Sequence, residues 1–341
     1  MGSVNHFIDT SRFMAARDYR AAVRGRGAGD ALRKHGASDA HPDAADGTPV
    51  AGQRLRDAAV AGQRLRDAAV ARQQLRNAVV LFGAPLDATM SFRSGARHGP
   101  RAIREYSYVL ETFSAQAGLD LETLALFDAG DVDIAPGEIR PALGMIHDAV
   151  REILSDGCKP LMLGGEHLVT LPAVEAVHGA YPGLMVIQID AHADMREQYL
   201  GQDLTHAGVM RRVSAVVGRE NIYSAGIRSI SADEYEYARC PATNFSPRLD
   251  ALDDFAHIAG NRPVYLTIDI DVVDPAFAPG TGAPEPGGPS SRELLDALAG
   301  LSGLDIVAAD IVEVAPPYDA AGITAALAAK IAREVIMMMA G

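Results

Sequence analysis

The sequence of 341 residues has only two cysteines, Cys158 and Cys240. Two cysteines exclude a disulfide framework and fit a reducing compartment such as the cytoplasm. No uninterrupted apolar run reaches the roughly 18 residues that a membrane-spanning helix needs. The N-terminus also lacks a basic stretch followed by an apolar core, so nothing indicates a secretion signal. We therefore expect a cytoplasmic protein that has no membrane partner.

Basic side chains are scarce: 31 Lys and Arg stand against 44 Asp and Glu, which gives a net charge of −13. This balance argues against a nucleic-acid partner and favours a small cationic one. The charge is unevenly distributed. Residues 1–78 carry 13 basic side chains, 8 Asp and no Glu, a net of +5, and the remainder carries −18. We expect two parts of the chain with different roles.

The first part contains a tandem repeat. AGQRLRDAAV occurs twice between Ala51 and Val70, and a degenerate third copy follows. Ten residues advance an ideal helix by about 1000°, roughly 80° short of whole turns, so the repeated leucines drift around it and form no single buried stripe. We interpret residues 1–76 as an extension that is flexible or partly helical, with a docking or oligomerisation arm as the alternative. Deleting residues 1–75 is expected to leave activity nearly intact.

Residues 77–341 are predicted to form one large α/β domain. Short apolar runs read as strands, and helical spacing of apolar residues predicts helices over 140–154 and Leu171–Val177 between them. Strands alternating with amphipathic helices are typical of a parallel sheet covered on both faces. The expected strands are Ala78–Gly83, Pro160–Leu163, Leu184–Ile189, Asn221–Gly226, Val264–Ile270 and Ile306–Val314.

Three of these strands end in carboxylates and imidazoles. Ligands bind at the carboxyl ends of the strands in such sheets, and alternate residues of an extended strand point the same way. If that geometry persists past the strand ends, the side chains converge in one crevice. The six candidates are His167, Asp190, His192, Asp194, Asp269 and Asp271. Seven of the other eight histidines, all except His206, belong to no comparable acidic cluster at a strand end, and we expect solvated or core positions for them.

Four carboxylates in one pocket repel one another, and removing ionised carboxylates from water is costly. Divalent cations relieve both problems, and four carboxylates can hold two. Oxygen-rich ligation with some imidazole suits Mn²⁺ better than Zn²⁺, although these residues leave Co²⁺, Fe²⁺ and Zn²⁺ open. Two such ions can lower the pKa of a shared water towards neutrality. The pattern therefore predicts a dinuclear metallohydrolase.

The same motifs resemble the signatures of the ureohydrolases, the arginase and agmatinase family, over about residues 78–338. Within the family the chain is most similar to agmatinases. The resemblance implies a three-layer α/β/α sandwich with a doubly wound, mainly parallel sheet and two Mn²⁺ ions per subunit. The matching stretches are SFRSGARHGPRAIRE (91–105), DAGDV (128–132), GGEHLVT (164–170), DAHADMRE (190–197), TIDIDVVDPAFAPGTGAPEPGG (267–288) and DIVEVAPPYDAAGIT (310–324).

By position, the resemblance also implies a role for each residue. It assigns His167, Asp190, Asp194 and Asp269 to one metal, and His192, Asp190, Asp269 and Asp271 to the other. Asp194 would also accept a hydrogen bond from the bridging hydroxide. His206 corresponds to a histidine that shuttles a proton near the leaving amine, and Glu313 to the carboxylate that grips the guanidinium.

The implied reaction is hydrolysis of agmatine to putrescine and urea, which would be a step of polyamine biosynthesis. The alternatives are hydrolysis of guanidinobutyrate, guanidinopropionate or a related linear guanidino compound, arginase activity, and a catalytically silent subunit. Three departures from the usual motifs, at Ala193, Ala283 and Pro289, lie near the expected pocket. The family also implies a homo-oligomer, a trimer or hexamer.

Overall fold

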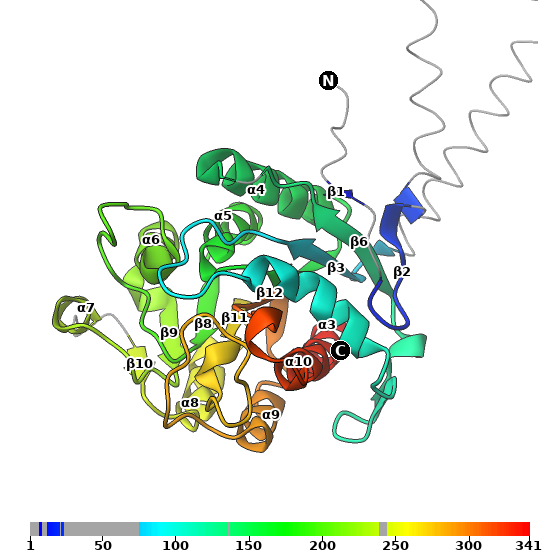
Figure 1. Ribbon diagram of the computed structural model, residues 1–341. Coiled ribbons are helices and arrows are strands. Elements are labelled where there is room, and N and C mark those ends of the chain that lie inside the picture. Colours follow the sequence, from blue (N-terminus) through cyan, green and yellow to red (C-terminus); the bar gives the residue numbers. More distant parts are fainter. Residues whose placement is uncertain (1–6, 9–11, 21, 24–74, 136, 239–243) are drawn as a thin grey trace, which may run out of the picture.

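Three layers make up the protein (Figure 1), which is described by a computed structural model over residues 7–8, 12–20, 22–23, 75–135, 137–238 and 244–341. A ten-stranded sheet lies between two helical layers, and each of its faces has its own hydrophobic core. One layer consists of α4 (Ile139–Ser155), α5 (Thr170–Ala180) and α6 (Val209–Val217). The other consists of α3 (Gly99–Ser107), α8 (Ala251–Ala259), α9 (Ser291–Ala299) and α10 (Ile323–Ala340).

The strands of this sheet run in the order β1-β6-β3-β7-β12-β11-β8-β9-β10, with β2 beside β6. All neighbours are parallel except β1 and β6. The bounds are β1 (Phe7–Ile8), β2 (Arg17–Asp18), β3 (Val79–Ala84), β6 (Leu126–Val132), β7 (Lys159–Gly164), β8 (Met185–Ile189), β9 (Ile222–Ala225), β10 (Asn244–Ser246), β11 (Pro263–Asp269) and β12 (Asp305–Val312). A small hairpin, β4 (Phe113–Ser114) and β5 (Leu119–Asp120), lies outside it.

The sheet order explains where a site can form. After β7 the chain skips two positions to form β8, and β11 and β12 later fill the gap. The carboxyl ends of β7, β12, β11 and β8 therefore lie side by side at one edge of the sheet. In sheets of this kind, such a change in strand order leaves a crevice in which ligands bind. Sequence segments about 150 residues apart are brought together there.

The predicted α/β/α sandwich is confirmed, and each of the six predicted strands appears within two residues of its predicted bounds. The sequence analysis missed β6, whose residues are all buried although two of them are aspartates. The strand was not predicted because these two charged residues interrupt its apolar run. Arg104 of α3 pairs with Asp128 at 2.9 Å and with Asp131 at 2.5 Å, so both carboxylates are neutralised inside the protein.

The N-terminal segment departs from the expected separate extension. Strands β1 and β2 both pair with β6, so part of residues 1–76 belongs to the sheet. Phe13, Met14 and Tyr19 are buried, and the backbone amide of Phe13 donates to Asp128 at 2.8 Å. These apolar side chains cover an edge that would otherwise be exposed. The two exact repeats, and any helix or flexibility in them, lie outside the described residues. The third copy ends within the described residues, where Leu75 is buried and the last two residues begin β3.

Among the residues described, no helix combines the length and apolar character that crossing a bilayer requires. The longest, α10, has 18 residues and packs most of its length against the sheet and α3. Its apolar residues therefore serve the core.

Because Phe13 is buried, we expect Phe13→Ala to lower the free energy of unfolding by about 3–5 kcal/mol, the usual effect of removing a buried aromatic ring. Urea unfolding followed by circular dichroism measures the change. Phe92→Ala is the matched control, since Phe92 is 72% exposed, and its effect should stay within about 0.5 kcal/mol. Equal stability of Phe13→Ala and the wild type would show that the N-terminal segment does not stabilise the sheet.

Candidate functional site

The turn after β7 positions His167. Gly164 and Gly165 allow the chain to pass closely beneath a neighbouring loop. A Cβ atom on Gly165 would lie only 1.9 Å from the carbonyl oxygen of Leu86, so no other residue fits without a shift of the backbone. His167 then begins a short 3₁₀ helix, His167–Val169, and its side chain is fully buried. The imidazole is therefore held rigidly at the end of the strand.

The segment after β8 positions three further side chains, although not in the expected way. The strand ends at Ile189, and the extended geometry does not persist to Asp194, whose φ of 53° lies in the left-handed region. Asp190 and Asp194 nevertheless both face His167, because the chain turns instead of running straight. A left-handed backbone at a residue other than glycine is strained, which is common where side chains must be placed for function.

Similarly, Asp271 does not reach the site by strand alternation. Strand β11 ends at Asp269, and Ile270–Val272 forms a 3₁₀ turn. The backbone amide of Asp271 donates to a carboxylate oxygen of Asp269 at 2.8 Å, which caps this turn. The two aspartates are both buried.

One cluster of ligand atoms surrounds His167. Its Nδ1 lies 3.1 Å from an oxygen of Asp190, 3.1 Å from one of Asp194 and 3.4 Å from one of Asp269. None of these contacts has hydrogen-bond geometry, so Nδ1 is buried without a hydrogen-bond partner among the described residues. Carboxylate oxygens gathered around one imidazole nitrogen repel one another unless positive charge lies among them, either a proton on the ring or a metal cation.

A second cluster adjoins the first. Nδ1 of His192 lies 2.9 Å from an oxygen of Asp271 and 3.9 Å from an oxygen of Asp190. Single ligand atoms from these three residues lie within 4.8 Å of one another, as do those from His167, Asp190 and Asp194. Asp190 belongs to both groups. The donor set of imidazoles and carboxylates therefore fits two adjacent divalent cations.

The electrostatics of the protein without metal point the same way. Burial raises the pKa of Asp269 well above its ordinary value, and the nearby Asp271 and Asp190 raise it further. Burial and Asp190 raise the pKa of Asp194 to about 6. Burial lowers the pKa of His192, but Asp271, Asp190 and Asp194 together outweigh burial and raise the pKa to about 11. Without a metal, protons on these groups must balance the buried negative charge.

Neutral side chains around the clusters orient the ligands. The Thr267 hydroxyl contacts Nε2 of His167 at 2.9 Å, which turns Nδ1 towards the carboxylates. The side-chain amide nitrogen of Gln188 donates to Asp190 at 2.8 Å, and the Ser224 hydroxyl donates to the side-chain oxygen of Gln188 at 2.6 Å. Such supporting contacts are typical of metal sites, because they fix the ligand atoms before the ion binds.

Glu313 follows β12 and is also buried, with a φ of 65°. One of its carboxylate oxygens accepts a hydrogen bond from the backbone amide of His167 at 2.7 Å, and the other lies near Gly282. Burial raises the pKa of Glu313 well above its ordinary value. A cation bound beside it would favour the ionised form.

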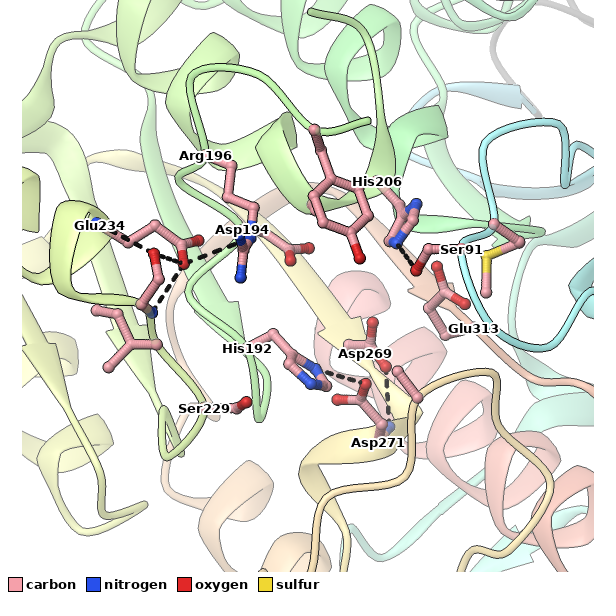
Figure 2. A pocket seen from close by; sticks show the side chains of 16 residues that line it. Ser91, His192, Asp194, Arg196, His206, Ser229, Glu234, Asp269, Asp271 and Glu313 are labelled. Carbon is pink, nitrogen blue, oxygen red and sulfur yellow. Dashed lines mark hydrogen bonds and ion pairs between the residues drawn. The ribbon is translucent and has the colours of Figure 1, made fainter. Parts of the chain in front are cut away.

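A pocket of about 310 Å³ opens above the clusters. Figure 2 shows Glu313 and His206 on one side of it and Arg196 and Glu234 on the other. Between them lie the side chains of the two clusters that reach the pocket, His192, Asp194, Asp269 and Asp271. The volume suits a small linear molecule that spans from Glu313 past the clusters.

Comparison with known proteins agrees with this geometry. The Arginase family matches residues 77–338. An agmatinase from Bacillus anthracis is 44% identical over 76% of this chain and 91% of its own, and a guanidinopropionase from Pseudomonas aeruginosa is 36% identical over 77% and 86%. The agmatine ureohydrolase structure of Thermoplasma volcanium superposes with a TM-score of 0.71 and 34% identity, over 78% of this chain and 90% of that one.

The chain belongs to the arginase family. The predicted membership, most similar to agmatinases, is confirmed, and with it the prediction that the protein is an enzyme that hydrolyses amidines. The structure brings all six predicted ligand residues to one edge of the sheet, and it places His206 and Glu313 in the adjoining pocket. Their roles as metal ligands and catalytic groups in this arginase-family chain stay predictions.

Several residues of the site were missed by the sequence analysis. Gln188 and Thr267 had a visible signal, since each is a polar residue inside an otherwise apolar strand. Arg196 lies within the matched stretch DAHADMRE, although the stretch did not assign it to the pocket. Glu234 had no signal, because charged residues on short helices such as α7 (Ala232–Ala238) are common. Only the folded chain shows that Arg196 and Glu234 line the pocket.

We expect Asp190→Asn to lose most Mn²⁺ binding, because the amide keeps the shape of the side chain but removes the charge that both clusters share. Isothermal titration and elemental analysis measure the stoichiometry. In the wild type, Mn²⁺ should displace protons, since the raised pKa values of His167 and His192 leave both imidazoles protonated at pH 7. Apparent affinity should therefore rise with pH.

Asp296→Asn, on the exposed side of α9, is the matched control and should bind Mn²⁺ as the wild type does. Full metal content in Asp190→Asn would contradict the assignment. Proton release is read from titrations in buffers of different ionisation enthalpy.

Proposed function

We propose that this protein hydrolyses agmatine to putrescine and urea at a dinuclear Mn²⁺ site. The observation that carries the proposal is the charge of the pocket: among the residues that line it, Arg196 faces the five carboxylates of Asp194, Glu234, Asp269, Asp271 and Glu313. Two divalent cations would balance the four ligand aspartates, Asp190 included. Glu313 and Glu234 then stand against Arg196, and the remaining net charge of −1 suits a cationic substrate that has no carboxylate. The 44% identity to an agmatinase supports the same substrate.

Glu313 is the group that would hold the guanidinium. Carboxylates pair with guanidinium groups through two parallel hydrogen bonds, which fix orientation as well as position. The amide of His167 already holds one Glu313 oxygen, so the carboxylate cannot rotate freely. The guanidino carbon is thereby kept beside the clusters.

Two divalent ions held by the six ligand residues would supply a hydroxide nucleophile at neutral pH and would stabilise the developing negative charge. In the hydrolysis, the oxygen of one water is added to the guanidino carbon, and the bond from that carbon to the alkyl nitrogen breaks. The Asp194 carboxylate, whose pKa lies at about 6 without metal, can accept the proton that the water loses. The alkyl nitrogen must gain a proton to leave as an amine.

His206 lies on the pocket side opposite Arg196 and can take part in this proton transfer (Figure 2). Burial, together with the positive charge of His167 and His192, lowers its pKa to about 4. The imidazole is therefore neutral at pH 7. It can accept a proton during the reaction and pass it readily to the departing amine.

A guanidino acid is the second candidate substrate, and one observation favours it. Arg196 lies at the end of the pocket away from Glu313, where it could pair with a substrate carboxylate. Its charge is offset by Glu234, whose nearest oxygen lies 3.7 Å from Nε of Arg196. Because of this partner, we favour agmatine.

The substrate is tested with Mn²⁺-loaded protein and four compounds: agmatine, arginine, 4-guanidinobutyrate and 3-guanidinopropionate. Urea release should be fastest with agmatine by at least about tenfold in kcat/KM, because the pocket is acidic. Urea formed from a guanidino acid alone would refute the agmatine proposal and support the second candidate. The absence of urea from all four would support a silent subunit.

We expect Glu313→Gln to bind both metals but to lose roughly 100-fold in kcat/KM, because a neutral amide cannot form the charged pair with the guanidinium. Steady-state urea assays and elemental analysis give the two readouts. Glu105→Gln, on the exposed side of α3, is the matched control and should keep wild-type values. Loss of metal in Glu313→Gln would show that Glu313 serves the metal site instead.

A further inference from the structure

The loop between β3 and α3 touches His206 through one side chain, Thr89. The Thr89 hydroxyl lies 3.0 Å from the backbone nitrogen of His206, which donates to it, and 3.1 Å from Nδ1 of the ring. One oxygen thus contacts both the backbone and the imidazole of the same residue. The other ring nitrogen, Nε2, lies on the side of Ser91, which lines the pocket, at 3.5 Å from its hydroxyl.

Thr89 is itself held by a buried carboxylate. The backbone amide of Thr89 donates to an oxygen of Glu166 at 2.7 Å, and the Glu166 side chain is fully buried. The backbone amide of Glu166 in turn donates to the carbonyl oxygen of Leu86 at 2.7 Å. Two bonds therefore join the turn after β7 to this loop, one on each side of the loop residue Asp87.

A second contact closes the same loop. The Asp87 carboxylate accepts from the backbone amide of Gly95 at 2.7 Å, so the ends of the loop are tied together. Its tip cannot drift away from the pocket while these bonds persist. Tyr199 covers the imidazole of His206 from another side, with the ring centroids 5.9 Å apart at an interplanar angle of 85°.

We propose that Thr89 is a positioning residue that holds His206 in one ring orientation and one tautomer, and that Glu166 acts through Thr89 by holding the loop. A neutral imidazole exchanges between two tautomers, and only one presents the correct nitrogen to a substrate. The hydroxyl of Thr89 next to Nδ1 favours the tautomer with which this hydroxyl completes its own hydrogen bonds. Because Nδ1 then stays either the donor or the acceptor, Nε2, the nitrogen that faces the pocket, keeps the opposite role.

This inference deepens the proposed function and rests on it, because the proton carried by His206 belongs to that reaction. The hydrogen-bond partners of Thr89 are Glu166 and His206, and neither is a predicted metal ligand. We therefore expect the metal site not to depend on the Thr89 hydroxyl. Replacing Thr89 is therefore expected to lower kcat and to leave KM and the metal content unchanged.

Thr89→Val tests the proposal, since it removes the hydroxyl and keeps the shape. We expect kcat for agmatine to fall roughly tenfold, and Thr89→Ser, which restores a hydroxyl, to recover most of it. On a His206→Ala background, Thr89→Val should cause no further loss, because Thr89 acts through His206. A loss that adds fully to that of His206→Ala, or a failure of Thr89→Ser to recover activity, would overturn the proposal.

Nuclear magnetic resonance of protein with ¹⁵N-labelled histidine gives a readout that needs no turnover. The ring nitrogens of His206 should report one tautomer in the wild type and an averaged mixture in Thr89→Val. An unchanged tautomer in Thr89→Val would refute the role of Thr89 even if the protein hydrolyses agmatine, whereas failure of the substrate assay alone would refute only the proposed function. Thr123→Val is the matched control, because Thr123 is an exposed residue of the 3₁₀ helix Leu121–Thr123 and does not line the pocket; the His206 signals should match those of the wild type.

Discussion

Repulsion between buried carboxylates is the constraint on which this structure depends. Four aspartates and Glu313 lie after β8, β11 and β12, and all five are buried, with at most 8% of each exposed. Burial alone raises the pKa of most of these groups, and each neighbouring carboxylate raises it further. Such a cluster persists in a folded protein only if positive charge balances it. The two histidines provide that charge as imidazolium ions when no metal is bound, and divalent cations provide it better.

The turn after β7 links the parts of the site to one another. Its histidine, His167, faces the aspartates, and the amide of the same residue holds Glu313. The preceding residue, Glu166, holds the loop that carries Thr89 and hence His206. Gly165 makes this possible, because a side chain there would collide with Leu86. The groups expected to hold metal, guanidinium and proton therefore share one rigid support.

Much of the fold was predictable because burial and periodicity are local properties of the sequence. The six apolar strands were found near their observed bounds, whereas β6 was not, since its aspartates are neutralised by Arg104 from a separate helix. Likewise, the N-terminal strands β1 and β2 have only two residues each, too few for a pattern. They form because β6 offers an edge with which to pair. A local reading contains no information about such distant partners.

The sequence by itself determined the chemistry of the site: which acids and imidazoles follow the strands, and that they need cations. Only the tertiary structure decided how they meet, because Asp194 and Asp271 arrive through a strained residue and a 3₁₀ turn and not by strand alternation. It also decided that Arg196, Glu234 and Thr89 belong to the pocket or its support. The physical reason is that residue types set charge and ligand preference, whereas distance depends on how strands far apart in the chain are ordered in the sheet.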